Sequence, residues 1–225
     1  MELIAIVSIS IIIFLGIFKT KIKGIIGEKT TSFYLDFLDK KKYNVINNIV
    51  IKSGNRTSQI DHIIISDFGI FVIETKNYKG WIFGNENSEY WTQVIFKHKS
   101  KFYNPIKQNY GHIKILKECL SEFPELKYKS IIVFSSKADL KINTITDVVN
   151  YSKLNSTIKR NTEKNLSQTE KDKVLRKIKS LNIIDQYDKN EHIQSIKKNI
   201  KEREILISEK ICPRCKNGLV LRNGK

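Results

Sequence analysis

The stretch Gln59–Gly80, with the sequence QIDHIIISDFGIFVIETKNYKG, decides the fold because it contains two apolar segments separated by a turn. Ile60–Ser66 and Ile70–Lys76 are rich in β-branched residues, which favour strands. The Asp-Phe-Gly tripeptide between them is typical of a tight hairpin turn. The stretch therefore predicts a buried β-hairpin.

Three charged residues interrupt these apolar segments, namely Asp61, Glu74 and Lys76. Burying a charge without a partner is unfavourable, so the three groups are expected to pair with one another or to share a ligand. Glu74 and Lys76 are two positions apart and lie on the same face of a strand. A two-residue loop that pairs Ser66 with Gly69 places Asp61 opposite Glu74, with Cβ atoms roughly 5 Å apart. A three-residue loop shifts the register and separates them.

Two carboxylates at this separation repel each other unless a cation lies between them. Mg²⁺ suits such a pair, because it takes one or two carboxylates and completes its coordination with water and phosphate oxygens. Lys76 is then placed to orient a water molecule or to neutralise charge on a phosphate. The alternative, a structural Asp/Glu/Lys cluster in a half-buried hairpin, stays open on spacing alone.

The segments QIDHIIIS and GIFVIETKNYKG resemble the core of the nuclease-related domain (NERD) family, which is similar to the PD-(D/E)xK restriction-endonuclease-like superfamily. The resemblance covers about Gly24–Ser136, and one departure from the superfamily is Ile60, where proline is common. Further matching positions are Gly27-Glu28, Trp91, Asn104-Pro105 and Gln108-Asn109.

This resemblance implies an α/β fold with a restriction-endonuclease-like core, in which a mixed sheet is flanked by helices. The order helix, strands, helix and strand along the chain independently predicts one sheet packed against helices. The resemblance also implies metal-assisted hydrolysis of nucleic-acid phosphodiesters, with Mg²⁺ as the cofactor and DNA or RNA as partner. The residues it assigns are Asp61, Glu74 and the Thr75 backbone for the metal, Lys76 for the water, and Gln108 and Glu28 in support.

Three polar residues near this centre have two interpretations each. Glu28 falls in the first turn of a helix expected at Gly27–Leu38, where it either interacts with the helix dipole or supports the metal site. Gln108 lies one turn into a helix that Asn104-Pro105 begins, and is either a supporting amide or a surface glutamine. His62 neighbours Asp61 on the strand and points to the opposite face, which favours a core histidine over a base.

The formal charge of +17 suggests an acidic partner such as nucleic acid or an anionic membrane surface, although Lys-rich composition runs through the whole chain. Lys97, Lys99 and Lys101 alternate with His98 and precede Phe102 and Tyr103. This basic and aromatic segment is expected to bind along a phosphate backbone, with Lys97, Lys99, Lys101 and Tyr103 as the nucleic-acid-binding residues.

The N-terminal segment 1–23 predicts a single-pass membrane anchor. Leu3–Phe18 is almost wholly apolar but shorter than the roughly 20 residues of a usual span. Lys19, Lys21 and Lys23 follow it and place the main domain on the cytoplasmic side. A cleaved signal peptide and a buried core helix are the alternatives; the first lacks a preceding basic residue and a cleavage site, and the second lacks a polar face.

Beyond the nuclease-like core at 24–136, residues 137–187 are expected to close the domain with a strand, from about Ile142 to Val149, and helices. Residues 188–210 predict a highly charged helix that is either a linker or a surface for pairing with another copy of the chain. The use of cysteine, three residues with two in a C-x-x-C, fits a reducing compartment.

The tail, residues 211–225, resembles the first half of the zinc ribbon of type IA topoisomerases. Structural Zn²⁺ takes four ligands, whereas the tail offers only Cys212 and Cys215. The motif is therefore expected to be truncated, completed by a second subunit, or a remnant; a redox pair is a further alternative.

Together these features predict a membrane-anchored NERD-type protein that hydrolyses nucleic acid. The alternative is a non-catalytic nucleic-acid-binding or scaffold module at the membrane. A third interpretation, a membrane signalling or assembly protein, rests on the anchor and the charged helix alone.

Overall fold

The computed structural model describes residues 22–54, 56–186, 201–213 and 215–219. The chain divides into two compact units, Met1–Ile183 and Ile184–Lys225. The predicted membrane segment Leu3–Phe18 lies outside the described residues. Within the described ranges, no helix has both the length and the apolar character needed to cross a membrane.

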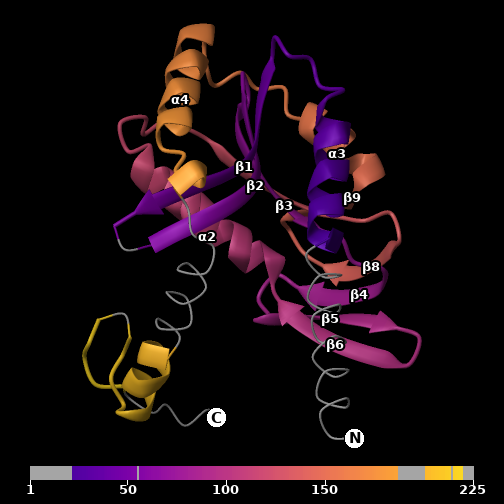
Figure 1. Cartoon of the computed structure of the whole chain (residues 1–225), viewed down its shortest axis with the longest axis vertical. Helices are drawn as coiled ribbons and strands as arrows, with labels where there is room; N and C mark the ends of the chain where they lie inside the picture. The colour runs from indigo at the N-terminus through magenta and orange to yellow at the C-terminus, as the bar shows by residue number, and fades with distance from the viewer. Residues whose placement is uncertain (1–21, 55, 187–200, 214, 220–225) are drawn as a thin grey trace, which may run out of the picture. The chain divides into compact units, whose positions relative to one another are not determined.

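A five-stranded mixed sheet forms the centre of the first unit, in the order β1-β2-β3-β7-β9 (Figure 1). The first three strands are antiparallel, and β7 and β9 continue the sheet in parallel with β3. The bounds are β1 Tyr43–Ser53, β2 Arg56–Ser66, β3 Gly69–Lys76, β7 Tyr128–Phe134 and β9 Asp147–Asn150.

A second sheet of four strands follows the order β6-β5-β4-β8, and Figure 1 shows its strands below the central sheet. β4 and β8 are parallel, whereas β4, β5 and β6 form antiparallel pairs. The bounds are β4 Gly80–Asn85, β5 Tyr90–Ile95, β6 His98–Tyr103 and β8 Ala138–Asn143. The helices are α2 Pro105–Cys119, α3 Tyr151–Lys159, α4 Gln168–Ser180 and the short 3-10 helix η1 Ile184–Gln186, which belongs to the second unit.

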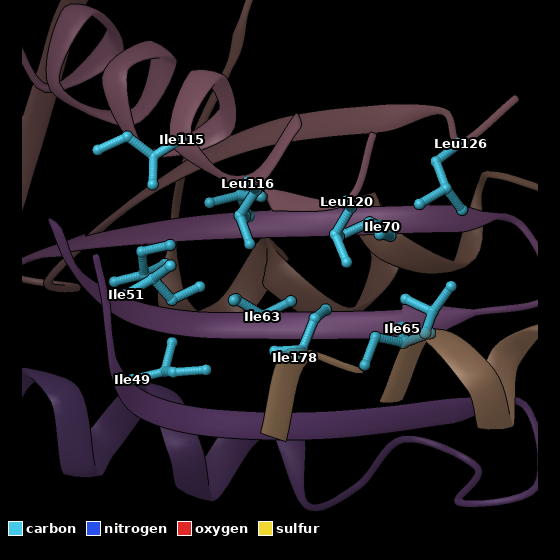
Figure 2. Packing of buried hydrophobic residues seen from close by; sticks show 13 residues of the cluster. Ile49, Ile51, Ile63, Ile65, Ile70, Ile115, Leu116, Leu120, Leu126 and Ile178 are labelled. Carbon is cyan, nitrogen blue, oxygen red and sulfur yellow. The ribbon is translucent and has the colours of Figure 1, made fainter. Parts of the chain in front are cut away.

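Helices cover both faces of the central sheet, because alternate strand residues supply apolar side chains to each face. One face packs against α2 and α4, and Figure 2 shows Ile115 and Leu116 of α2 and Ile178 of α4 over the isoleucines of the strands. The other face packs against α3 and the N-terminal helix, which occupies residues 22–35 of the described chain. Neighbouring Ile63 and Ile64 of β2 contribute to opposite cores, as the two-residue repeat of a strand requires.

Two local predictions are confirmed. Ser66 pairs with Gly69 and His62 with Ile73, so the hairpin has the predicted two-residue loop and register. The helix α2 begins as predicted at Asn104, whose side chain accepts a hydrogen bond from the Ile106 N–H across 2.9 Å. The α/β fold is also confirmed in its coarse form, since two sheets flanked by helices fit a restriction-endonuclease-like core.

Three predictions need correction. The expected single sheet is two sheets, because β4, β5, β6 and β8 pair among themselves as a separate sheet. The expected strand Ile142–Val149 is divided between β8 in the second sheet and β9 in the first. Glu28 lies well inside the N-terminal helix, which already runs at residue 22, so the first-turn dipole interpretation of Glu28 does not apply.

In the second unit, the described part of the predicted charged helix is helical over residues 201–208. The tail then turns back on itself, with an antiparallel bridge between Ile211 and Gly218. Cys212 and Cys215 are not joined in a disulfide, and no group of three or more metal-ligating side chains occurs in the described ranges. A zinc ribbon at this tail stays a prediction.

Candidate active site

Glu74 on β3 is the centre of a hydrogen-bonded network in which both of its carboxylate oxygens have a donor. Its Oε1 accepts from Lys76 Nζ across 2.7 Å, and its Oε2 accepts from His112 Nε2 across 3.2 Å. The residue is only 2% exposed. Burial raises the pKa of Glu74, but Lys76 and His112 outweigh it and hold the pKa below its usual value. Glu74 is therefore a buried, ionised carboxylate.

The Lys76 side chain forms a hydrogen-bonded bridge between strand β3 and helix α2. Its Nζ donates to Glu74 and also to Gln108 Oε1 across 3.0 Å. Burial lowers the pKa of Lys76, and the adjacent Glu74 carboxylate more than offsets this, so that the pKa lies above its usual value. The ammonium group has three N–H donors, and these two contacts leave one for a ligand.

Asp61 on β2 lies beside this network. The strand pairing ends at His62 and Ile73, one position before Asp61 would pair with Glu74, and Asp61 Oδ2 instead accepts from the Thr75 N–H across 2.8 Å. Burial raises the pKa of Asp61 well above its usual value, and the negative charges of Glu74 and Glu28 raise it further. Asp61 and Glu74 are therefore close enough for their charges to interact. The positive charge of Lys76 lowers the pKa of Asp61 but does not offset its burial.

This donor set fits a hard divalent cation. Carboxylate oxygens are the ligands that Mg²⁺ prefers, and a cation beside Asp61 would offset the burial and the neighbouring negative charges that raise its pKa. Because no cluster of three metal-ligating side chains is present among the described residues, such an ion would depend on water for much of its coordination. That is usual for Mg²⁺ and unusual for structural Zn²⁺.

Gly27 allows the N-terminal helix to approach the end of β3. A Cβ atom at Gly27 would lie 2.8 Å from Asn77 Cβ and 3.3 Å from Thr75 Cγ2, so a side chain there would push the helix away. One turn further on, the Thr31 hydroxyl is hydrogen-bonded to the Thr75 hydroxyl across 3.0 Å. This close crossing brings the charge of Glu28 within reach of Asp61 and explains the Gly27-Glu28 pair structurally.

A cavity of about 890 Å³ opens beside the network, and Thr75 and Lys76 form part of its wall. Three further lysines line it, namely Lys23, Lys79 and Lys137. Concentrated positive charge in a concave site favours an anionic ligand such as a phosphodiester. The cavity therefore connects the Glu74 network to the space where a substrate phosphate can bind.

The predicted nucleic-acid-binding residues lie elsewhere, on the second sheet. Lys99, Lys101 and Tyr103 project from β6, and Lys97 occupies the turn before it. His62 is buried at 1% exposure, with Nδ1 hydrogen-bonded to Asn47 Oδ1, and burial lowers its pKa to about 4. This agrees with the interpretation of His62 as a core residue.

Sequence reasoning missed His112, the second donor to Glu74. It lies on α2 four residues after Gln108, and residues separated by four share a helix face. That spacing was a usable signal once Gln108 was a candidate. Ser58 of β2 was also missed; its hydroxyl is hydrogen-bonded to His112 Nδ1, which orients the ring so that Nε2–H points to Glu74.

Comparison with known proteins places these residues in a family. The nuclease-related domain matches residues 23–135, a range that holds Glu28, Asp61, Glu74, Lys76 and Gln108. An uncharacterized protein of Bacillus anthracis is 38% identical over 179 residues, which cover 77% of this chain and 84% of that protein. No solved structure matches the chain significantly. Because the family model matches half of the chain, the chain belongs to the nuclease-related domain family.

Proposed function

We propose that this protein hydrolyses phosphodiester bonds of nucleic acid at the Asp61–Glu74–Lys76 centre, with Mg²⁺ as cofactor. The observation that carries the proposal is the position of the Lys76 ammonium. It is fixed by Glu74 and Gln108, it lines a lysine-rich cavity, and it lies next to the destabilised carboxylate of Asp61. A fixed cation at the wall of an anion-binding cavity is suited to stabilising charge on a phosphate.

Each residue has a distinct role in this proposal. Asp61, Glu74 and the Thr75 carbonyl would hold Mg²⁺, which when bound supplies the charge that polarises a phosphoryl oxygen. Lys76 orients the attacking water with its third N–H and neutralises charge on the phosphate. Gln108 keeps the Lys76 ammonium in place.

Two residues act on the carboxylates rather than on the substrate. His112 is hydrogen-bonded to Oε2 of Glu74, which limits the directions in which Oε1 of the same carboxylate can point. Glu28 adds negative charge next to Asp61, which strengthens the attraction of this site for a cation.

A cleavage assay tests the proposal. Full-length protein is incubated with supercoiled DNA, linear DNA and RNA, in Mg²⁺ and in EDTA. We expect cutting in Mg²⁺ only, and loss of cutting in Glu74→Gln. Glu118→Gln is the matched control. Glu118 is an exposed glutamate near the end of α2, ten residues after Gln108, and it pairs with Arg56. Full metal-dependent cutting by Glu74→Gln would refute the assignment.

A second function, nucleic-acid binding without cleavage, is favoured by one observation. Both oxygens of Glu74 already have protein donors, so the network is complete in itself. In that case binding is salt-sensitive and indifferent to Asp61→Asn and Glu74→Gln, and no condition yields cut product.

Membrane attachment and a zinc-binding tail belong to the proposal as well. A single-pass anchor at Leu3–Phe18, with the nuclease-related domain on the cytoplasmic side, rests on the apolar run and the lysines that follow it. Zn²⁺ at Cys212 and Cys215 needs ligands beyond these two thiols. Membrane fractionation and zinc analysis test the two points separately.

A further inference from the structure

The second sheet presents one buried and one exposed face. Ile82 and Trp91 point inward and are fully buried against Phe134 of β7 and Ile106 of α2. The alternate residues of each strand point outward, and their exposure follows the two-residue repeat along β4, β6 and β8. The outward side chains of β4, β5, β6 and β8 therefore lie on one side of the sheet, which we call the outer face. Figure 1 shows the four strands that carry it.

Large aromatic rings occupy the middle of the outer face. Trp81 and Phe83 project from β4, Tyr90 from β5 and Tyr103 from β6, and they are 53%, 42%, 52% and 46% exposed. Trp81 and Phe83 lie edge to face with centroids 6.4 Å apart, and the directly paired Tyr90 and Tyr103 do so at 6.1 Å. Rings that are held by one another yet half exposed mark a site of interaction.

Lysines flank the rings on both edge strands. Lys99 and Lys101 lie on β6, opposite Val94 and Thr92 of β5, and Lys141 lies on β8, opposite Phe83. All three lysines are exposed. Lys141 also forms an ion pair with Asp139 across 3.1 Å, but an exposed pair of this kind is weak and leaves the ammonium available.

We propose that the outer face binds single-stranded nucleic acid, with unpaired bases stacked on the rings and phosphates held by the flanking lysines. The exposed rings favour a single strand over a duplex, because duplex bases are stacked on each other and offer no face to a side chain. The proposal rests on the proposed function only for the fate of the bound strand, which is to be cut at the Glu74 centre.

Two adjacent cavities connect the outer face with that centre. A cavity of about 440 Å³ is lined by Trp81 of the outer face, and it shares Lys79, Ile95 and Lys137 with the larger cavity that Lys76 lines. A strand stacked on Trp81 can therefore pass the two shared lysines and reach Lys76. The route needs a flexible backbone, which a single strand has and a stiff duplex lacks.

Binding is tested by fluorescence anisotropy with the full chain, in EDTA so that nothing is cut. The probes are labelled oligo(dT) and a duplex of the same length. We expect Trp81→Ala and Tyr103→Ala each to weaken oligo(dT) binding about tenfold while duplex binding stays within about twofold. Tyr110→Ala is the matched control, since Tyr110 is 68% exposed on α2, away from the outer face, and should not alter binding.

A salt series tests the lysines. Replacing Lys99 and Lys101 by alanine should reduce the slope of log affinity against log salt by about 0.7 per lysine for the single strand. Ring variants that bind oligo(dT) as tightly as wild type overturn the proposal, as does an equal loss for strand and duplex. The proposal is also overturned if a ring variant sediments differently from wild type while its affinity for oligo(dT) is unchanged. That result would make the outer face a contact between copies of the chain.

The two proposals fail in different ways. Ring-dependent binding of oligo(dT) by a protein that cuts no substrate in Mg²⁺ leaves the outer face intact and refutes the nuclease. Cutting of single strands that keeps its KM in Trp81→Ala and Tyr103→Ala refutes the outer face and leaves the nuclease.

Discussion

The Lys76 ammonium lies 2.7 Å from the Glu74 carboxylate, and the two residues leave the same face of β3 two positions apart. The pair is shielded from water, since the side chains are 18% and 3% exposed. A pair this deeply buried is not evidence for stability by itself, because desolvation offsets much of the attraction. Removal of either side chain, however, leaves the charge of the other buried without its partner.

Lys76→Met is therefore expected to destabilise the protein and to remove catalysis. It leaves Glu74 buried with only His112 as donor, which should cost about 3–5 kcal/mol of unfolding free energy. The cleavage rate should fall about 10²- to 10³-fold with the loss of the fixed charge. Urea unfolding and an initial-rate assay measure the two effects.

The double variant Glu74→Gln with Lys76→Met separates the effects of the two residues. It removes both charges, so most of the lost stability should return while cleavage stays absent. A single Lys76→Met variant as stable as wild type would contradict the pairing described here.

Asp61→Asn is expected to raise the melting temperature at pH 7. Burial and two neighbouring carboxylates disfavour the ionised form of Asp61, and asparagine can still accept the Thr75 N–H. Millimolar Mg²⁺ should raise the melting temperature of wild type and not that of Asp61→Asn, because the ion supplies the missing positive charge only where a carboxylate is present.

Asp139→Asn serves as the control for this experiment, since Asp139 is an exposed aspartate that pairs with Lys141. It should keep the full Mg²⁺ response. An equal response in wild type and Asp61→Asn would exclude Asp61 as a ligand.

Local sequence signals predicted the hairpin and its neighbours well. The register of β2 against β3 follows from a two-residue loop, and the start of α2 follows from an asparagine cap and a proline, so both are properties of a few adjacent residues. The pairing of Glu74 with Lys76 was readable for the same reason. The two-residue repeat of a strand places both side chains on the same face.

Features that depend on distant packing were not predicted. His112 reaches Glu74 only because α2 docks on β3, and the sequence of α2 does not state where it docks. The outer face was missed because its rings lie on separate strands, although the alternation of Lys99, Lys101 and Tyr103 with Ser100 and Phe102 already indicated a strand. The cluster of Glu74, Lys76 and Gln108 was thus predictable, whereas the contacts of His112 and Ser58 were not.

Gly84→Ala is expected to destabilise the second sheet. A Cβ atom at Gly84 would lie 2.4 Å from the ring of Trp91, which is fully buried and donates its Nε1–H to Asn85 O across 3.0 Å. Overpacking of this kind costs about 1–3 kcal/mol. Chemical denaturation followed by tryptophan fluorescence measures it.

Gly111→Ala is the matched control, because Gly111 lies inside α2 and a Cβ atom there meets nothing within 4 Å. Alanine is the better helix former, so this variant should be more stable than wild type by about 0.5–1 kcal/mol. Equal effects of the two substitutions would show that space at Trp91 does not decide the outcome.

Tyr151 provides a test at alkaline pH. Burial raises its pKa to about 12, and it is only 6% exposed, where α3 packs on the N-terminal helix. Because the pKa in the folded state lies above the ordinary tyrosine value of 10.0, the folded state holds this proton to higher pH than the unfolded state does. The resulting stability is fully present below pH 10 and is lost as the pH rises through about 12.

Tyr151→Phe removes this contribution, so between pH 10 and 12 its unfolding free energy should fall less steeply than that of wild type, by about 2 kcal/mol in total. In an absorbance titration of phenolate, the variant should lose one late-ionising group. A late phase that is the same in wild type and Tyr151→Phe would mean that water reaches this hydroxyl, and that the N-terminal helix does not pack against α3 as closely as the hydrogen bond from the Tyr151 hydroxyl to Gly27 O, 3.5 Å long, requires.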